Sequence, residues 1–321
     1  MAVILVTGGA GFVGSHACKA LAAAGYRPVV YDNLTTGHRD LVRWGPLEQG
    51  DLLDAARLDA VLAAHRPEAV LHFAALSAVG DSVRDPERYR RNNVEGSLAL
   101  IGAMERHGVR RMIFSSTAAV YGIPQRLPIT EDAPLAPINP YGETKAAIER
   151  ALAASELAWT ALRYFNAAGA DPGGEIGEHH ETETHLIPIV LHVALGLRPS
   201  VAIFGDDYDT PDGTCVRDYI HVSDLAQAHV LALRRLEGGG ASGPLNLGTG
   251  RGTSVQEIVD LARAVTGHAI PAEHGPRRPG DPPVLVCSNE AARAVLGWQP
   301  RHDTATQVAD AWRWHRGRFG A

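Results

Sequence analysis

Lysine is almost absent from this chain, because only Lys19 and Lys145 appear among its 30 lysine and arginine residues. The 36 acidic residues leave a net charge of −6, and no basic run occurs, so a nucleic-acid partner is not expected. Long apolar runs are absent too. No segment approaches the roughly 18 uncharged residues of a membrane span, and the chain enters a strand with no signal-type segment. We therefore predict a soluble cytoplasmic protein with no membrane partner.

Cysteine is equally sparse. Cys18, Cys215 and Cys287 are odd in number and widely separated along the chain. This spacing argues against a disulfide framework and against a cysteine zinc site, and it favours a reduced compartment. The length of 321 residues allows one large α/β domain with a smaller second lobe.

Apolar strands alternate with amphipathic helices through the first half of the chain, which is typical of a parallel sheet with helices on both faces. From residue 166 onward the pattern changes, and residues 169–185 form a polar, glycine-rich stretch. We predict a Rossmann-type doubly wound α/β fold, with one domain made of 1–165 plus about 214–247 and a smaller C-terminal lobe made of about 166–213 plus 248–321. Expected strands are 3–7, 28–31, a short one ending near 50, 69–75, 111–116, 159–164, 219 onward and 244–248; expected helices are 11–24, one ending near 65, 86–107, 141–155, 186–197, one ending near 236, 255–266 and 291–296.

A glycine turn follows the first expected strand and opens the first helix, in the sequence Gly8-Gly-Ala-Gly11-Phe-Val-Gly14. Glycines there let the backbone approach a pyrophosphate at a helix N-terminus. Asp32 ends the next strand, where a carboxylate can bind ribose hydroxyls and repel a 2′-phosphate. The pattern predicts a dinucleotide site that prefers NAD to NADP. Asp51 has two interpretations, since it could cap the following helix or face the adenine.

A tyrosine and a lysine lie four residues apart in Tyr141-Gly-Glu-Thr-Lys145, so they share one face of a helix. A cation beside the phenol favours phenolate, and we expect the pKa of Tyr141 to lie below its usual value. Thr117 ends a strand at the edge where such folds bind ligands, and it could hold a substrate hydroxyl while Tyr141 accepts its proton. Together these residues predict oxidation of an alcohol.

Two other groups of polar residues have a simpler interpretation. Glu178-His179-His180-Glu181, with His185 beyond, could suggest a metal site. Adjacent histidines converge poorly on one ion, however, so we predict a solvated loop and no metal. Arg217 and Arg278 are either surface residues or clamps for diphosphate oxygens.

These motifs resemble those of the UDP-glucose 4-epimerases, a family of the extended short-chain dehydrogenase/reductase superfamily, and the similarity runs nearly end to end. The superfamily shares Thr7-Gly-Gly-Ala-Gly-Phe-Val-Gly-Ser-His16 and Phe114-Ser-Ser-Thr117. Closer to the epimerases themselves are Ala202-Ile-Phe-Gly205, Val216-Arg-Asp-Tyr-Ile-His-Val222 and Arg277-Arg-Pro-Gly-Asp281.

The resemblance implies an NAD-binding domain, a nucleotide-sugar-binding lobe and a homodimer. It implies that Tyr141 is the base, that Lys145 lowers its pKa and holds the nicotinamide ribose, and that Thr117 shares the substrate proton. The implied NAD contacts are Gly8, Gly11, Phe12, Val13, Gly14, Asp32, Asn33, Asp51, Leu52, Phe73, Ala74, Ala75, Asn92, Ser115, Tyr141, Lys145 and Tyr164. The implied UDP-sugar contacts are Thr117, Tyr141, Asn166, His185, Leu186, Ala202, Phe204, Arg217, Arg278 and Asp281.

Three positions depart from the family pattern. Ser77 stands where relatives carry a lysine near the cofactor pyrophosphate, and His185-Leu186 replaces an asparagine-leucine pair beside the substrate diphosphate. Leu285 occupies a gate position where a small residue admits N-acetylated sugars and a bulky aromatic excludes them. A 4-epimerase of UDP-N-acetylglucosamine or of a UDP-pentose therefore stays open as an alternative.

The resemblance implies a mechanism in which a transient 4-keto sugar turns in the pocket and is reduced on its other face. A 4,6-dehydratase is disfavoured, because those enzymes follow the strand-end threonine with an Asp-Glu pair and this chain has Ala118-Ala119. A non-catalytic NAD-sensing protein is a further alternative, against which the intact Tyr141, Lys145 and Thr117 argue.

Overall fold

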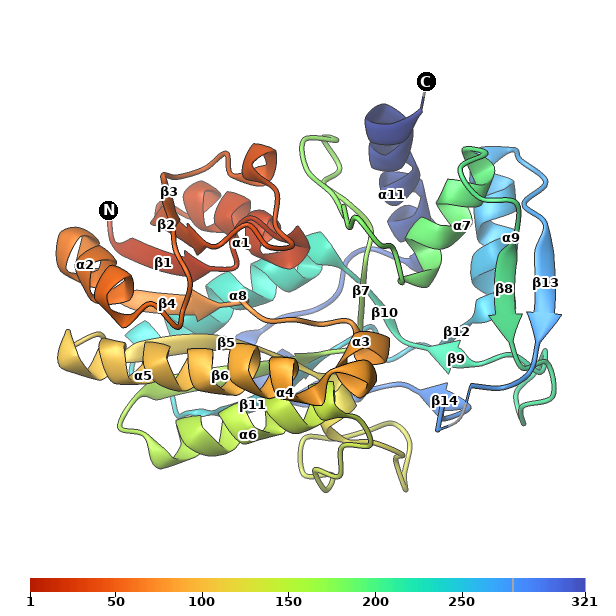
Figure 1. The fold of residues 1–321 in the computed structure, drawn as a ribbon. Coiled ribbons are helices and arrows are strands. Elements are labelled where there is room, and N and C mark those ends of the chain that lie inside the picture. The colour runs from red at the N-terminus through yellow and green to blue at the C-terminus, as the bar shows by residue number, and fades with distance from the viewer. Residues whose placement is uncertain (279, 321) are drawn as a thin grey trace.

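The computed structural model describes residues 1–278 and 280–320, and a seven-stranded parallel sheet lies at its centre (Figure 1). The strand order is β11-β6-β5-β4-β1-β2-β3, so strands are added in one direction from β1 to β3 and in the other from β4 to β11. This is the order of a doubly wound dinucleotide-binding sheet, and it confirms the predicted fold class. The strands are β1 (Val3–Thr7), β2 (Arg27–Asp32), β3 (Leu47–Gln49), β4 (Ala69–His72), β5 (Arg111–Thr117), β6 (Ala158–Tyr164) and β11 (Gly243–Leu247).

Helices cover both faces of this sheet, which is why the residues of β1, β2 and β4 are nearly all buried. α1 (Phe12–Ala23) and α8 (Val222–Glu237) pack their apolar sides on one face, with Leu21 and Leu233 fully buried there. On the other face lie α2 (Ala55–His65), α5 (Gly96–Arg106) and α6 (Pro140–Ala154), whose buried residues include Leu62, Met104 and Leu152.

A second core lies among three helices of the smaller lobe, which stand together at one side of the molecule (Figure 1). They are α7 (Leu186–Ala194), α9 (Val255–Thr266) and α11 (Thr304–Phe319), and α11 was not predicted. The short sheets pair β8 (Val201–Phe204) with β13 (Ala272–Gly275), β9 (Val216–Arg217) with β12 (Thr253–Ser254) and β14 (Val284–Leu285), and β7 (Asn166–Ala168) with β10 (Tyr219–His221).

The chain crosses between the two lobes more than once. α10 (Glu290–Leu296) and Trp298 belong to the late part of the sequence, yet Ala292 and Trp298 are buried in the core beside α1 and α8. The predicted domain boundaries stay a prediction. In the part of the chain that the structure describes, no helix is long and apolar enough to cross a membrane.

The helix predicted for 86–107 is confirmed as one helical run from Pro86 to Arg106, but its middle is π-helical and not α-helical. The structure has α3 (Val79–Arg84), α4 (Pro86–Tyr89), a π-helical segment (Arg90–Glu95) and then α5, with 3₁₀ turns elsewhere at Arg39–Leu41 and Ala118–Val120. The π turn carries the buried Asn93, whose side chain bonds both to Leu76 and to the Thr144 hydroxyl. The extra residue in that turn thus presents a polar side chain to the core, which a regular amphipathic pattern does not reveal.

Two predicted ends were also too long. β4 ends at His72 and not at residue 75, because the chain then passes over the glycine turn, close to Gly8. α7 ends at Ala194, just before Gly196, which has a φ of 73°. Glycine readily adopts that left-handed conformation, and it commonly follows a helix end.

Candidate active site

The glycine turn after β1 forms a cradle at the point where the strand order reverses. A Cβ added to Gly8 would lie 2.5 Å from the Ala74 nitrogen, and one on Gly14 would lie 2.2 Å from the Gly8 oxygen. α1 begins at Phe12 without a side-chain cap, so its first N–H groups are available to a ligand. Close backbone approach and a free helix N-terminus fit a dinucleotide pyrophosphate.

Asp32 lies at the carboxyl end of β2, where its two oxygens accept hydrogen bonds from the Ala10 nitrogen at 3.0 Å and the Leu34 nitrogen at 2.9 Å. Burial raises its pKa, and these backbone donors oppose the shift. The carboxylate is thereby held at the ribose position of the predicted site. Asp51 accepts from Asn33 Nδ2 at 2.8 Å. The alternative in which Asp51 caps α2 is wrong, because Asp54 does so.

Tyr141 and Lys145 project from the first turns of α6. Asn139 caps this helix by accepting from the Gly142 nitrogen at 2.9 Å, and Pro140 occupies its first turn. The Lys145 ammonium donates to the Ser115 carbonyl at 2.8 Å and lies 5.8 Å from the centre of the Tyr141 ring. β5 ends at Thr117, so the three predicted catalytic residues come from adjoining parts of β5 and α6.

The pKa of Tyr141 does not lie below its usual value in these surroundings, and the lowering effect of Lys145 stays a prediction. Burial raises the pKa of Tyr141 to about 12, and the neighbouring Thr117 hydroxyl opposes the rise only in part. Burial also lowers the pKa of Lys145 to about 7, although the Glu149 carboxylate opposes that shift. Desolvation disfavours charge on both groups, so this pair alone does not hold Tyr141 in its phenolate form at neutral pH.

Sequence reasoning missed two buried residues that position the pair. Glu149 lies four residues after Lys145 on α6 and accepts from the Ser116 hydroxyl at 2.5 Å and from Arg163 Nη2 at 2.5 Å. This network ties α6 to β5 and β6. Asn93, through its bond to Thr144 at 3.1 Å, joins the same helix to the loop after β4. Glu149 could have been found from sequence, because its spacing of four residues from Lys145 places both on one face of α6. Asn93 could not, because no sequence pattern indicates the π turn that carries it.

The smaller lobe contributes a second cluster. Arg217 is 9% exposed and donates to Asp281 at 2.8 Å, while the Arg278 guanidinium lies 4.0 Å from the centre of the Phe204 ring. A cavity of about 490 Å³ here is lined by Arg278 and Asp281, together with Tyr208 and other residues. Ala202 and Phe204 are exposed on β8. The lining of this cavity includes none of the other predicted contacts from residue 166 onward, which are Asn166, His185, Leu186, Ala202, Phe204 and Arg217.

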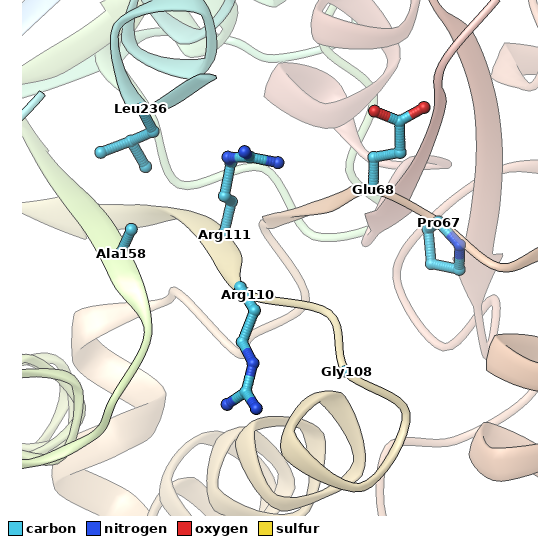
Figure 2. Close-up of a pocket in the computed structure, with 7 residues that line it drawn as sticks. All are labelled: Pro67, Glu68, Gly108, Arg110, Arg111, Ala158 and Leu236. Carbon is cyan, nitrogen blue, oxygen red and sulfur yellow. The ribbon is translucent and has the colours of Figure 1, made fainter. Parts of the chain in front are cut away.

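Another cavity of about 490 Å³ lies at the amino ends of strands in the central sheet (Figure 2). Its lining includes Glu68, Arg111 and Ala158, which stand before or at the start of β4, β5 and β6. Figure 2 shows Arg111 and Glu68 pointing to one side and Arg110 to the other. Parallel α/β sheets bind ligands at the carboxyl ends of their strands, so this cavity is not the active site.

The glycine cradle, the strand-end Asp32 and the pair of Tyr141 with the buried Lys145 define a class of protein: Rossmann-fold enzymes that bind NAD beside a tyrosine. Residues 4–248 match the model of the NAD dependent epimerase/dehydratase family, and the chain belongs to this family.

Several relatives match along almost their whole length. A UDP-glucose 4-epimerase of Rhizobium leguminosarum bv. trifolii is 54% identical over 97% of this chain and 97% of its own. The crystal structure of UDP-glucose 4-epimerase from Brucella ovis in complex with NAD is 50% identical, covers 97% of this chain and 98% of that one, and has a TM-score of 0.95. A Bifidobacterium longum UDP-glucose 4-epimerase in complex with NAD+ and UDP is 38% identical, covers 98% of each chain and has a TM-score of 0.93.

Proposed function

We propose that this protein interconverts UDP-galactose and UDP-glucose by NAD-dependent 4-epimerisation through a transient 4-keto sugar. The observation that carries the proposal is the placement of Tyr141, Lys145 and Thr117 at one edge of an NAD-type sheet. The full-length similarity to UDP-glucose 4-epimerases supports the same activity.

Each residue has a task that follows from its position. Bound NAD supplies a hydride acceptor and donor and, in its oxidised form, a positive charge. Tyr141 takes the proton of the C4 hydroxyl and later returns it, and Thr117 shares that proton through its hydroxyl. Lys145, held on the Ser115 carbonyl, keeps a donor beside the cofactor ribose. Burial raises the pKa of Tyr141. The phenolate therefore needs a further positive charge near it, in addition to that of Lys145.

Arg217 and Arg278 are placed to hold the UDP diphosphate. A guanidinium offers planar, paired donors to phosphate oxygens. The Asp281 carboxylate orients Arg217, and the Phe204 ring supports Arg278. Tight binding of the nucleotide, with few fixed contacts to the hexose, lets the 4-keto sugar rotate in the pocket while UDP stays bound.

Particular residues argue for or against two other activities, a dehydratase and a 4-epimerase of another UDP-sugar. Ala118 and Ala119 follow Thr117 and cannot donate or accept protons, which disfavours a dehydratase. Leu285, in β14, packs beside Val120 and Phe165. This leaves acceptance of UDP-N-acetylglucosamine or of a UDP-pentose as the second candidate function.

The deciding experiment is incubation of the purified protein with UDP-galactose, without added cofactor, followed by separation of the products. We expect UDP-glucose to form until the two sugars reach equilibrium. Conversion of UDP-N-acetylgalactosamine in a parallel reaction would show that Leu285 admits the larger sugar. If UDP-galactose stays unchanged even after NAD is supplied, the protein acts on another nucleotide sugar or is an NAD sensor.

We also infer a homodimer formed through α5 and α6, which lie next to each other at the front of Figure 1. Leu98 on α5 is 47% exposed, and Val83 on the nearby α3 is 63% exposed. Apolar side chains on adjoining helices favour a second copy as the partner. We expect Leu98→Asp to convert the dimer to a monomer in light scattering at micromolar concentration, and Leu197→Asp, on the other lobe, to leave it intact. A monomeric wild type would refute the inference.

All three cysteines are free and buried. Free thiols are typical of a reducing compartment, so we place the protein in the cytoplasm.

A further inference from the structure

Four side chains converge just before α7: Glu178, His180, Glu183 and His185. One donor atom from each lies within 4.8 Å of the other three. His180 Nδ1 is 3.2 Å from Glu183 Oε2 and 3.5 Å from Glu178 Oε1, and His185 Nδ1 contacts the same Glu178 oxygen. The solvated loop predicted for this stretch is wrong at both glutamates, whose side chains are 3% and 2% exposed.

The cluster concentrates negative charge away from water. Two buried carboxylates are costly unless positive charge or strong donors compensate them. The Thr184 and His185 nitrogens each donate to Glu183 Oε1 at 2.8 Å, which leaves Glu183 Oε2 facing His180. The site therefore attracts positive charge.

Two protonated histidines would balance the charge, with His180 donating to Glu183 Oε2 and His185 to Glu178 Oε1. A single divalent ion supplies the same balance and brings both carboxylates and both imidazoles to one centre. Zinc binds imidazole nitrogen and carboxylate oxygen at about 2.0–2.1 Å, so tetrahedral ligand atoms lie about 3.3 Å apart. The separations of 3.2 and 3.5 Å from His180 Nδ1 to the two carboxylates match that spacing. His185 Nδ1 lies closer than this to Glu178 Oε1 and 4.0 Å from Glu183 Oε1, so its side chain shifts when an ion binds.

We propose that Glu178, His180, Glu183 and His185 bind one divalent transition-metal ion, with zinc as the expected occupant. Two imidazoles and two carboxylates are ligands that zinc accepts, and together they balance its charge. Four protein ligands make the site structural. All four ligands belong to the segment before α7, and a separate hydrogen bond holds this segment to α11, since the Glu178 carbonyl accepts from Trp314 Nε1 at 3.0 Å.

His179 provides a matched control beside the site. In sequence it lies between two of the four ligands, Glu178 and His180. Its ring nevertheless stacks on His38, with 3.8 Å between ring centres, and so is not part of the cluster. The earlier objection that adjacent histidines do not converge therefore holds for His179 and His180. The ligands are instead spaced at residues 178, 180, 183 and 185.

The test measures the metal content of the untagged full-length protein, purified from zinc-supplemented cells and desalted, by plasma mass spectrometry. We expect about one zinc per chain in the wild type and in His179→Asn, and less than about a tenth of that in His180→Asn and Glu183→Gln. Cobalt exchanged into the wild type should give visible absorption bands typical of tetrahedral coordination, absent from both ligand variants.

Glu183→Gln and a chelator guard against a variant that fails to fold. Removal of the ion from the wild type should lower its melting temperature, and the chelator should not change that of Glu183→Gln. Trace metal in the wild type with no uptake of added zinc would overturn the proposal, as would equal metal content in all four proteins. If the wild type contains one iron or manganese ion per chain and the ligand variants lack it, the metal site is confirmed. Zinc would then be the wrong occupant.

Discussion

Replacing Tyr141 with phenylalanine should lower kcat for UDP-galactose by about 10³-fold or more, in line with the loss of a positioned acid–base group. The substitution removes one oxygen from a side chain that otherwise packs in α6 beside Lys145. Binding of NAD and UDP should persist. Because the lost interaction acts on the moving proton, kcat and kcat/KM should fall together, with KM nearly unchanged. Initial rates by product separation, with NAD content measured on the same samples, check this.

Tyr89→Phe is the matched control. Tyr89 is also buried near α6, but its hydroxyl donates to the Ala78 carbonyl at 2.7 Å and so has a structural task. Its removal should cost about 1 kcal/mol of unfolding free energy and leave turnover within a few-fold of the wild type. Near-normal activity in Tyr141→Phe would rule out the phenol as the base. An equal loss in Tyr89→Phe would mean that packing, and not proton transfer, explains the effect.

The parts of the fold that could be predicted from sequence are those in which local pattern and tertiary packing agree. The β1–turn–α1 unit has its glycines, its strand and its helix within a few residues of one another, so spacing alone locates the cradle. Tyr141 and Lys145 lie on one helix, and α6 begins near the predicted position because Asn139 and Pro140 mark its start.

The remaining features depend on contacts between distant residues. The π turn at Arg90–Glu95 exists with Asn93 buried against Leu76 and Thr144, which no periodicity encodes. The pKa of Tyr141 was predicted from the nearby cation, yet burial by the rest of the fold dominates it. For the same reason Glu178 and Glu183 looked like exposed loop residues, because their burial depends on how the segment packs on the protein.

A substitution in the glycine cradle should have the second large effect, on the affinity for NAD. Gly14→Ala should weaken NAD binding by about 100-fold, equivalent to about 3 kcal/mol. Alanine is the better helix former by about 1 kcal/mol, so propensity alone favours the substitution at this position in α1. Sterics oppose it. The new Cβ would lie 2.2 Å from the Gly8 oxygen and 2.9 Å from Gly9 Cα, and both are backbone atoms.

The backbone of the turn must therefore shift, and with it the donors that face the pyrophosphate. Gly80→Ala is the control, because a Cβ there meets nothing within 4 Å on the helix α3. Copurified NAD and a titration followed by fluorescence should show full occupancy for Gly80→Ala and little for Gly14→Ala, whose unfolding free energy should also fall by about 1–3 kcal/mol. Equal NAD affinity in the two variants would mean that the pyrophosphate does not depend on the close approach of Gly14 to Gly8, and that Asp32 and the strand ends carry the binding instead.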